Sequence, residues 1–103
     1  MSQESFVGIC FENLQDSPTI ASLQEHYICF TDNLLSACDI LFKYIVKQSS
    51  QNNRTFHIEK YDMSVDELHS RDILPYPINF YTFNESYECI CNRTNDVVWS
   101  AQT

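Results

Sequence analysis

Glycine, basic residues and long apolar runs are all scarce in this chain. Its 103 residues include a single glycine, Gly8, which excludes the glycine-rich loops that let a backbone approach a phosphate closely. Six bases stand against 14 acids, which gives a formal net charge of −8 at pH 7. This charge argues against a nucleic acid or an anionic membrane as the partner, because Lys and Arg must offset the negative charge of both.

The apolar residues do not form a run long enough for a membrane helix, which needs ~20 of them in succession. No stretch combines the basic start and apolar centre of a signal peptide, so we expect a cytoplasmic protein. In that compartment the five cysteines are expected to be free thiols. With so few glycines, the tight turns must rely on Asn and Asp.

The cysteines and histidines show no metal or cofactor signature. Cys89 and Cys91 form a C-x-C pair on a predicted strand, where both thiols point to the same face. A zinc site would need a second such pair or histidines at ligand spacing, and neither is present. We therefore interpret the cysteines as small apolar core residues and predict no enzyme activity. A Cys–His or carboxylate active site is the alternative, and no motif supports it.

The chain has the composition of one globular domain spanning residues 1–103, with 44% hydrophobic residues and seven Phe, six Tyr and one Trp. Its most periodic segment, residues 32–48, predicts a long helix capped by Thr31 or Asp32, with a favourable i,i+4 pair between Asp39 and Lys43. The apolar stripe of this helix consists of Leu34, Leu35, Cys38, Leu41, Phe42, Ile45 and Val46.

The remaining segments predict strands around this helix. Alternation and β-branched or aromatic content predict strands at 4–11, 25–30, 56–61, 78–83, 87–93 and 97–101. Residues 18–23 fit a short helical turn or a loop, and residues 48–55 a flexible loop. Ser64 and Glu67 form a capping box that starts a short helix near 65–72. The pattern predicts an α+β fold, a mostly antiparallel sheet of about five to six strands packed on the long helix.

Charge is segregated along the chain. The first 42 residues contain six acids and no base, and residues 59–88 contain seven acids, two bases and several aromatics. Acids around partly exposed tyrosines suit an interface with a basic protein. The alternative is that the acids only keep the protein soluble. The predicted partner-binding residues are Asp62, Asp66, Glu67, Asp72, Tyr76, Tyr81, Glu85, Tyr87 and Glu88.

These features favour a small acidic inhibitor of the immunity or antitoxin type, which neutralises a basic, nuclease-like toxin by occluding its active cleft. One alternative is a phage or viral anti-defence protein that blocks a nucleic-acid-binding host factor. A second is a small enzyme or enzyme subunit. A third is a generic oligomeric interaction protein, for which we expect a self-complementary apolar patch.

Overall fold

The computed structural model describes residues 3–13, 23–47 and 54–101. The predicted helical turn or loop at 18–23 lies outside these residues except for Leu23, and so do residues 48–53 of the predicted loop. One sheet and two helices form a single α+β domain, as the sequence predicts. In chain order the elements are β1 (Ser5–Asn13), β2 (Leu23–Thr31), α1 (Leu34–Lys47), β3 (Arg54–Tyr61), α2 (Val65–His69), β4 (Asn79–Phe83), β5 (Glu88–Cys91) and β6 (Val97–Ser100).

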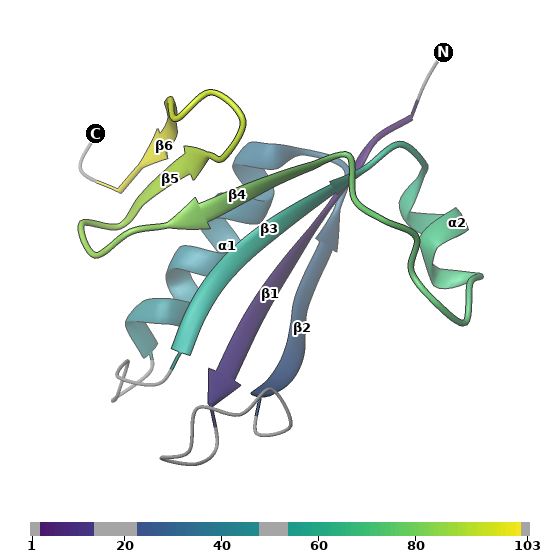
Figure 1. Cartoon of the computed structure of the whole chain (residues 1–103), viewed down its shortest axis with the longest axis horizontal. Coiled ribbons are helices and arrows are strands. Elements are labelled where there is room, and N and C mark those ends of the chain that lie inside the picture. Colours follow the sequence, from purple (N-terminus) through teal and green to yellow (C-terminus); the bar gives the residue numbers. More distant parts are fainter. Residues whose placement is uncertain (1–2, 14–22, 48–53, 102–103) are drawn as a thin grey trace.

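The sheet has the order β2-β1-β3-β4-β5-β6, and every neighbouring pair is antiparallel (Figure 1). Strands β2 and β3 both run antiparallel to β1, so they run parallel to each other and α1 forms the crossover between them. The last three strands form the predicted antiparallel meander. This topology places α2 and the β4–β5 turn near opposite ends of the longest axis of the molecule (Figure 1).

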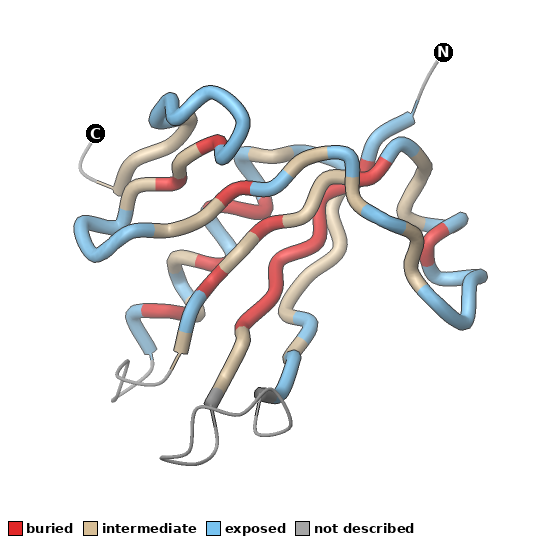
Figure 2. The backbone as a smooth tube through the Cα atoms, in the orientation of Figure 1, coloured by how far each residue is buried: buried red, intermediate tan, exposed pale blue. Residues whose placement is uncertain are grey.

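Strand β1 is the centre of the fold. Both of its faces are apolar, and buried residues concentrate along it (Figure 2). The pairing of β1 with β2 is irregular between Gly8 and Ile9. A Cβ at Gly8 would lie 2.8 Å from Cys29 Sγ. The glycine therefore provides the space that the Cys29 thiol occupies on the neighbouring strand.

Helix α1 covers one face of the sheet. Its buried residues are Ala37, Cys38, Leu41 and Ile45, and they share the first core with side chains from β1, β3, β4 and β5. The stripe is narrower than predicted, because Leu35 and Val46 are exposed.

The N-terminus of α1 corrects the predicted cap. Asn33 is the capping residue rather than Thr31 or Asp32, because its side-chain oxygen accepts the Ser36 N–H at 3.1 Å. The predicted Asp39–Lys43 pair is confirmed at 3.1 Å.

Helix α2 covers part of the opposite face. Ser64 Oγ accepts the Glu67 N–H at 3.2 Å, which confirms the predicted cap. The helix ends at His69 rather than near Asp72. Its buried residue Leu68 joins a second core with Val7, Ile9 and Tyr61, so α2 lies over β1 and β3 and not over the meander.

Two further details of the backbone differ from or refine the prediction. Arg54 and Thr55 belong to β3 and not to the preceding loop, because both pair with β1. Asn95 adopts a φ of 63° in the turn before β6, as expected for a chain with a single glycine, whereas Tyr87 adopts a φ of 61° before β5. None of the described helices is long and apolar enough to cross a membrane.

Candidate interaction surface

The short helix α2 presents carboxylates on its outer side. Its fully buried Leu68 fixes which side faces the sheet. Asp66 and Glu67 in the first turn are therefore exposed, as is Asp62 just before the cap. Asp66 and Glu67 also lie where the helix dipole favours negative charge. The helix dipole and exposure to solvent thus explain why these carboxylates are tolerated here without a base from the same chain to pair with them.

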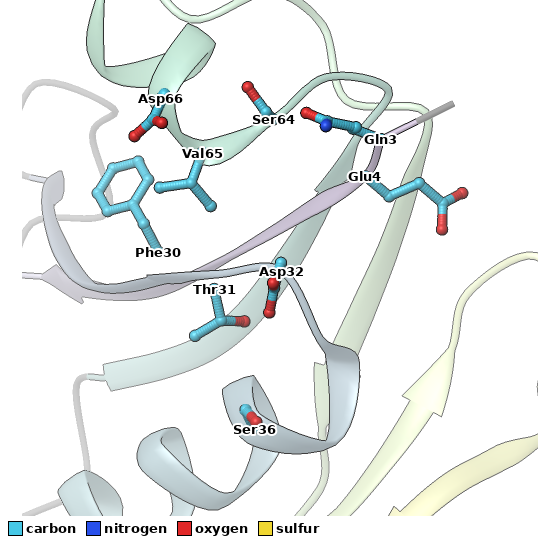
Figure 3. A pocket seen from close by; sticks show the side chains of 9 residues that line it. All are labelled: Gln3, Glu4, Phe30, Thr31, Asp32, Ser36, Ser64, Val65 and Asp66. Atoms are coloured by element: carbon cyan, nitrogen blue, oxygen red, sulfur yellow. The ribbon is translucent and has the colours of Figure 1, made fainter. Parts of the chain in front are cut away.

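A polar pocket of about 680 Å³ lies between α2 and the first turn of α1 (Figure 3). Three carboxylates line it, those of Glu4, Asp32 and Asp66. Figure 3 shows that they come from three separate segments: the chain before β1, the loop before α1, and α2. The other lining residues are Gln3, Phe30, Thr31, Ser36, Ser64 and Val65, which are mostly small and polar.

Only one of these three carboxylates is neutralised by an ion pair in the described part of the chain. Lys60 Nζ lies 3.0 Å from Glu4 Oε2. Asp32 and Asp66 have no ion pair with any base that the structure describes. We call Asp32, Asp62, Asp66, Glu67 and Asp72 the acidic end. None of these five carboxylates has an ion pair with a base that the structure describes.

The structure divides the predicted partner-binding residues between two ends of the sheet. Asp62, Asp66, Glu67, Asp72 and Tyr76 surround α2 and the segment that follows it, whereas Glu85, Tyr87 and Glu88 lie at the β4–β5 turn. The five-residue strand β4 separates these two groups. They therefore do not form one continuous patch.

The three predicted tyrosine anchors have different environments. Tyr76 is 96% exposed, whereas Tyr81 is only 6% exposed and belongs to the first core. The prediction of Tyr81 as an anchor is wrong, because strand alternation turns it toward α1. Tyr87 is partly exposed, and its ring packs edge-on against Phe42 with 5.6 Å between centroids.

A second cavity, of about 690 Å³, lies at the end of the sheet near the β4–β5 turn. Glu85 and Tyr87 line it together with the side chains of Ile45, Phe56 and Phe83. This cavity is less acidic than the pocket beside α2, since Glu85 is its single carboxylate. Arg54 also lines this cavity, so Glu85 and Tyr87 share a site whose described charges are of both signs.

A cluster of tyrosines and glutamates on the sheet face opposite α1 was not predicted from the sequence. Tyr61 donates a hydrogen bond to Glu59 at 2.5 Å, and Tyr27 donates one to Glu25 at 3.1 Å. Burial, assisted by the nearby Glu25 charge, raises the pKa of the Glu59 carboxyl despite the bond from Tyr61. The E-x-Y spacing in both β2 and β3 was the available signal, because residues two apart share a face of a strand.

The cysteines occupy two chemically different environments. A hydrogen bond with Cys38, together with burial, raises the pKa of the Cys89 thiol. At the end of β5, hydrogen bonds from the side chains of Thr94 and Asn79 lower the pKa of the Cys91 thiol to about 7. The Asn79 Nδ2 lies 3.5 Å from Cys91 Sγ. Both thiols belong to the first core, but Cys91 is 7% exposed and has the lowered pKa, whereas Cys89 is fully buried.

Within residues 3–13, 23–47 and 54–101, no group of three or more His, Cys, Asp or Glu side chains is arranged to hold a metal ion. Comparisons with protein-family models, curated proteins and solved structures found no match.

Proposed function

We propose that this protein is a small acidic inhibitor of the immunity or antitoxin type, which binds a basic, nuclease-like protein through its acidic end. A nuclease cleft carries Lys and Arg to hold phosphates. Carboxylates presented on a rigid domain offer those side chains an alternative counter-charge, and the bound domain then blocks the cleft.

The observation that carries the proposal is the position of Asp32 and Asp66 in one pocket with no base paired to either in the described structure. Lys60 offsets Glu4 alone. A guanidinium or ammonium group that entered the pocket would meet two uncompensated carboxylates and several small hydroxyl groups. Asp62, Glu67 and Asp72 do not line this pocket, but they precede or follow its α2 residues in sequence, and their negative charge would steer a basic partner toward this part of the molecule.

A triple variant tests this proposal with a matched control. Asp62→Asn, Asp66→Asn and Glu67→Gln together remove three charges from the acidic end. Glu85→Gln, Glu88→Gln and Asp96→Asn remove the same number from the meander. Each protein is used to capture partners from the native host, and the affinity for the purified partner is then measured as salt is raised.

We expect the wild type and the meander variant to capture the same basic nuclease and to inhibit it. Their affinity should fall as salt rises, and the acidic-end variant should bind at least about tenfold more weakly with a shallower salt dependence. An equal loss of affinity in the two variants would show that binding depends only on the total charge of the protein. A captured host factor that binds nucleic acid without cleaving it would favour the anti-defence alternative.

One observation favours a second candidate function, a thiol-based enzyme. Cys91, with its lowered pKa, lies beside Asn79 and Thr94, two groups that can stabilise a thiolate. Substitution of Cys91 by Ser leaves the acidic end unchanged. It should therefore abolish any thiol chemistry and leave binding of the basic partner intact, which separates the two functions.

A further inference from the structure

An apolar ridge extends from α2 into β4. We define this ridge by its four exposed apolar side chains, Ile73 at 85% exposure, Tyr76 at 96%, Ile78 at 43% and Phe80 at 42%. Single exposed apolar side chains are ordinary, but four within eight consecutive positions concentrate exposed apolar surface on one segment. The ridge begins directly after Asp72 of the acidic end.

The register of the sheet places the β4 part of this ridge on the face opposite α1. Tyr81 faces the first core, so its neighbour Phe80 faces away from α1 and lies opposite Glu59 on β3. On the same face, Ile90 pairs with Val97 across β5 and β6, and Val97 is half-exposed. The second core, which α2 covers, contains none of these meander residues. This half of the face therefore has no covering element among the described residues.

The backbone of the ridge is held in place. Pro75 and Pro77 restrict its dihedral angles. The Ile78 N–H donates to the Lys60 carbonyl at 2.8 Å, and Arg93 Nη2 donates to the Ile78 carbonyl at 3.3 Å. Leu74 packs against the second core from within the same segment. A partner that binds this ridge loses little backbone entropy, because the exposed side chains stand on a chain that is already ordered.

We propose that the apolar ridge and the acidic end form one interface, in which the ridge supplies the apolar anchors for a basic protein partner. This inference rests on the proposed function and adds the surface that gives the complex its apolar contact. Glu59 lies beside Phe80 and Asp72 beside Ile73, and two bases, Arg71 and Arg93, also flank the ridge. The acidic end adds Asp32, Asp62, Asp66 and Glu67, and this excess of acids over the combined interface selects the occupant. A second copy of this chain, with a net charge of −8, would bring the same acids against each other, and an anionic membrane would also be repelled.

Synthetic peptides provide defined probes for this interface. Three amphipathic peptides share the same Leu positions and carry Lys, Gln or Glu at every polar position. Each is titrated into the full chain, and backbone amide NMR shifts identify the contacted residues. We expect the Lys peptide to bind most tightly and to shift Ile73, Tyr76, Phe80 and Ile90, with further shifts at the acidic end. The Glu peptide should not bind.

Paired substitutions locate the apolar contact. Ile73→Ser with Tyr76→Ser changes two highly exposed side chains and so spares the fold, and Phe80→Ser extends the test into β4. Leu35→Ser with Val46→Ser is the matched control, because these exposed apolar residues lie on α1. We expect the ridge variants to weaken binding of the Lys peptide at least about fivefold at both low and high salt. The α1 control should bind as the wild type does.

The outcomes separate failure of this inference from failure of the proposed function. The Lys peptide could bind, shift amide resonances only at the acidic end, and keep its affinity in the ridge variants. That result would show that the ridge is not part of the interface, and it would leave the proposed function standing. Equal binding of the Lys and Gln peptides would contradict selection by charge and hence both proposals. Self-association of the chain through the ridge, measured by sedimentation without peptide, would overturn the choice of a basic partner.

Discussion

At the scale of single residues, hydrogen bonding gives chemically identical cysteine thiols different pKa values. All five cysteines are free, and the sequence identified them correctly as mainly core residues, since four are buried. It could not distinguish Cys91 from Cys89, because strand alternation places both on the same face. The difference arises from the turn after β5, which brings Thr94 back toward the Cys91 sulfur.

This arrangement predicts the pH dependence of alkylation. A lowered pKa means that the Cys91 thiolate persists down to about pH 7, whereas an ordinary thiol loses it near ~8.5. The rate of iodoacetamide labelling at Cys91, followed by peptide mass spectrometry, should therefore reach half its maximum near pH 7. The Cys91 thiolate stabilises the fold fully at a pH above the pKa that this thiol has in the unfolded chain. This stabilisation is lost as the pH falls through the pKa that the thiol has in the folded protein.

The control for this titration is a pair of threonine substitutions. Thr94→Val removes the largest cause of the shift and should move the labelling midpoint upward. Thr82→Val removes a hydroxyl that bonds to Asn92 instead and should leave the midpoint in place. A midpoint that stays the same in both variants would show that the Thr94 hydroxyl does not stabilise the thiolate.

At the scale of elements, predictions succeeded where one strong pattern determined the structure. The periodicity of α1, the two apolar faces of β1 and the cap of α2 each appear in the structure. Errors lie at the boundaries, where several side chains compete for the same role. Asn33 caps α1 although Thr31 and Asp32 precede it, and Arg54 and Thr55 extend β3 because β1 is long enough to pair with them.

The packing of α1 can be tested by two leucine substitutions on opposite sides of the helix. Leu41 is fully buried against the sheet, so Leu41→Ala should lower the free energy of unfolding by about 2–5 kcal/mol. Leu35 is exposed, so Leu35→Ala should change it by no more than about 0.5 kcal/mol. Urea denaturation gives both values. Similar losses in the two variants would mean that α1 packs on the sheet through a different face.

At the scale of the whole molecule, distance along the sequence was a poor guide to the candidate site. Asp72 and Glu85 belong to the same acidic stretch, yet β4 carries the chain away from α2 between them. Conversely, Glu4, Asp32 and Asp66 are far apart in sequence and share one pocket. The sequence specified the charge of the protein and the elements that carry it. The grouping of charges depends on the β2–α1–β3 crossover, which composition does not reveal.

The acids on the connection between β3 and β4 should also affect the stability of the molecule. Like charges held near each other disfavour the compact state, and salt screens them. Neither Asp62 nor Asp72 has an ion pair with a described base, so Asp62→Asn with Asp72→Asn should raise the free energy of unfolding at low salt by about 0.5 kcal/mol. The gain should shrink as sodium chloride is added.

Asp39→Asn is the matched control, because it removes an acid that is paired with Lys43 on the exposed side of α1. This variant should be neutral or slightly less stable than the wild type at low salt. Thermal or urea unfolding across a salt series measures all three proteins. A stability gain confined to Asp62 and Asp72 would show that the acidic end lowers the stability of the fold, as expected for charges retained for binding rather than for folding. Loss of stability in that variant would instead assign these two carboxylates a structural role.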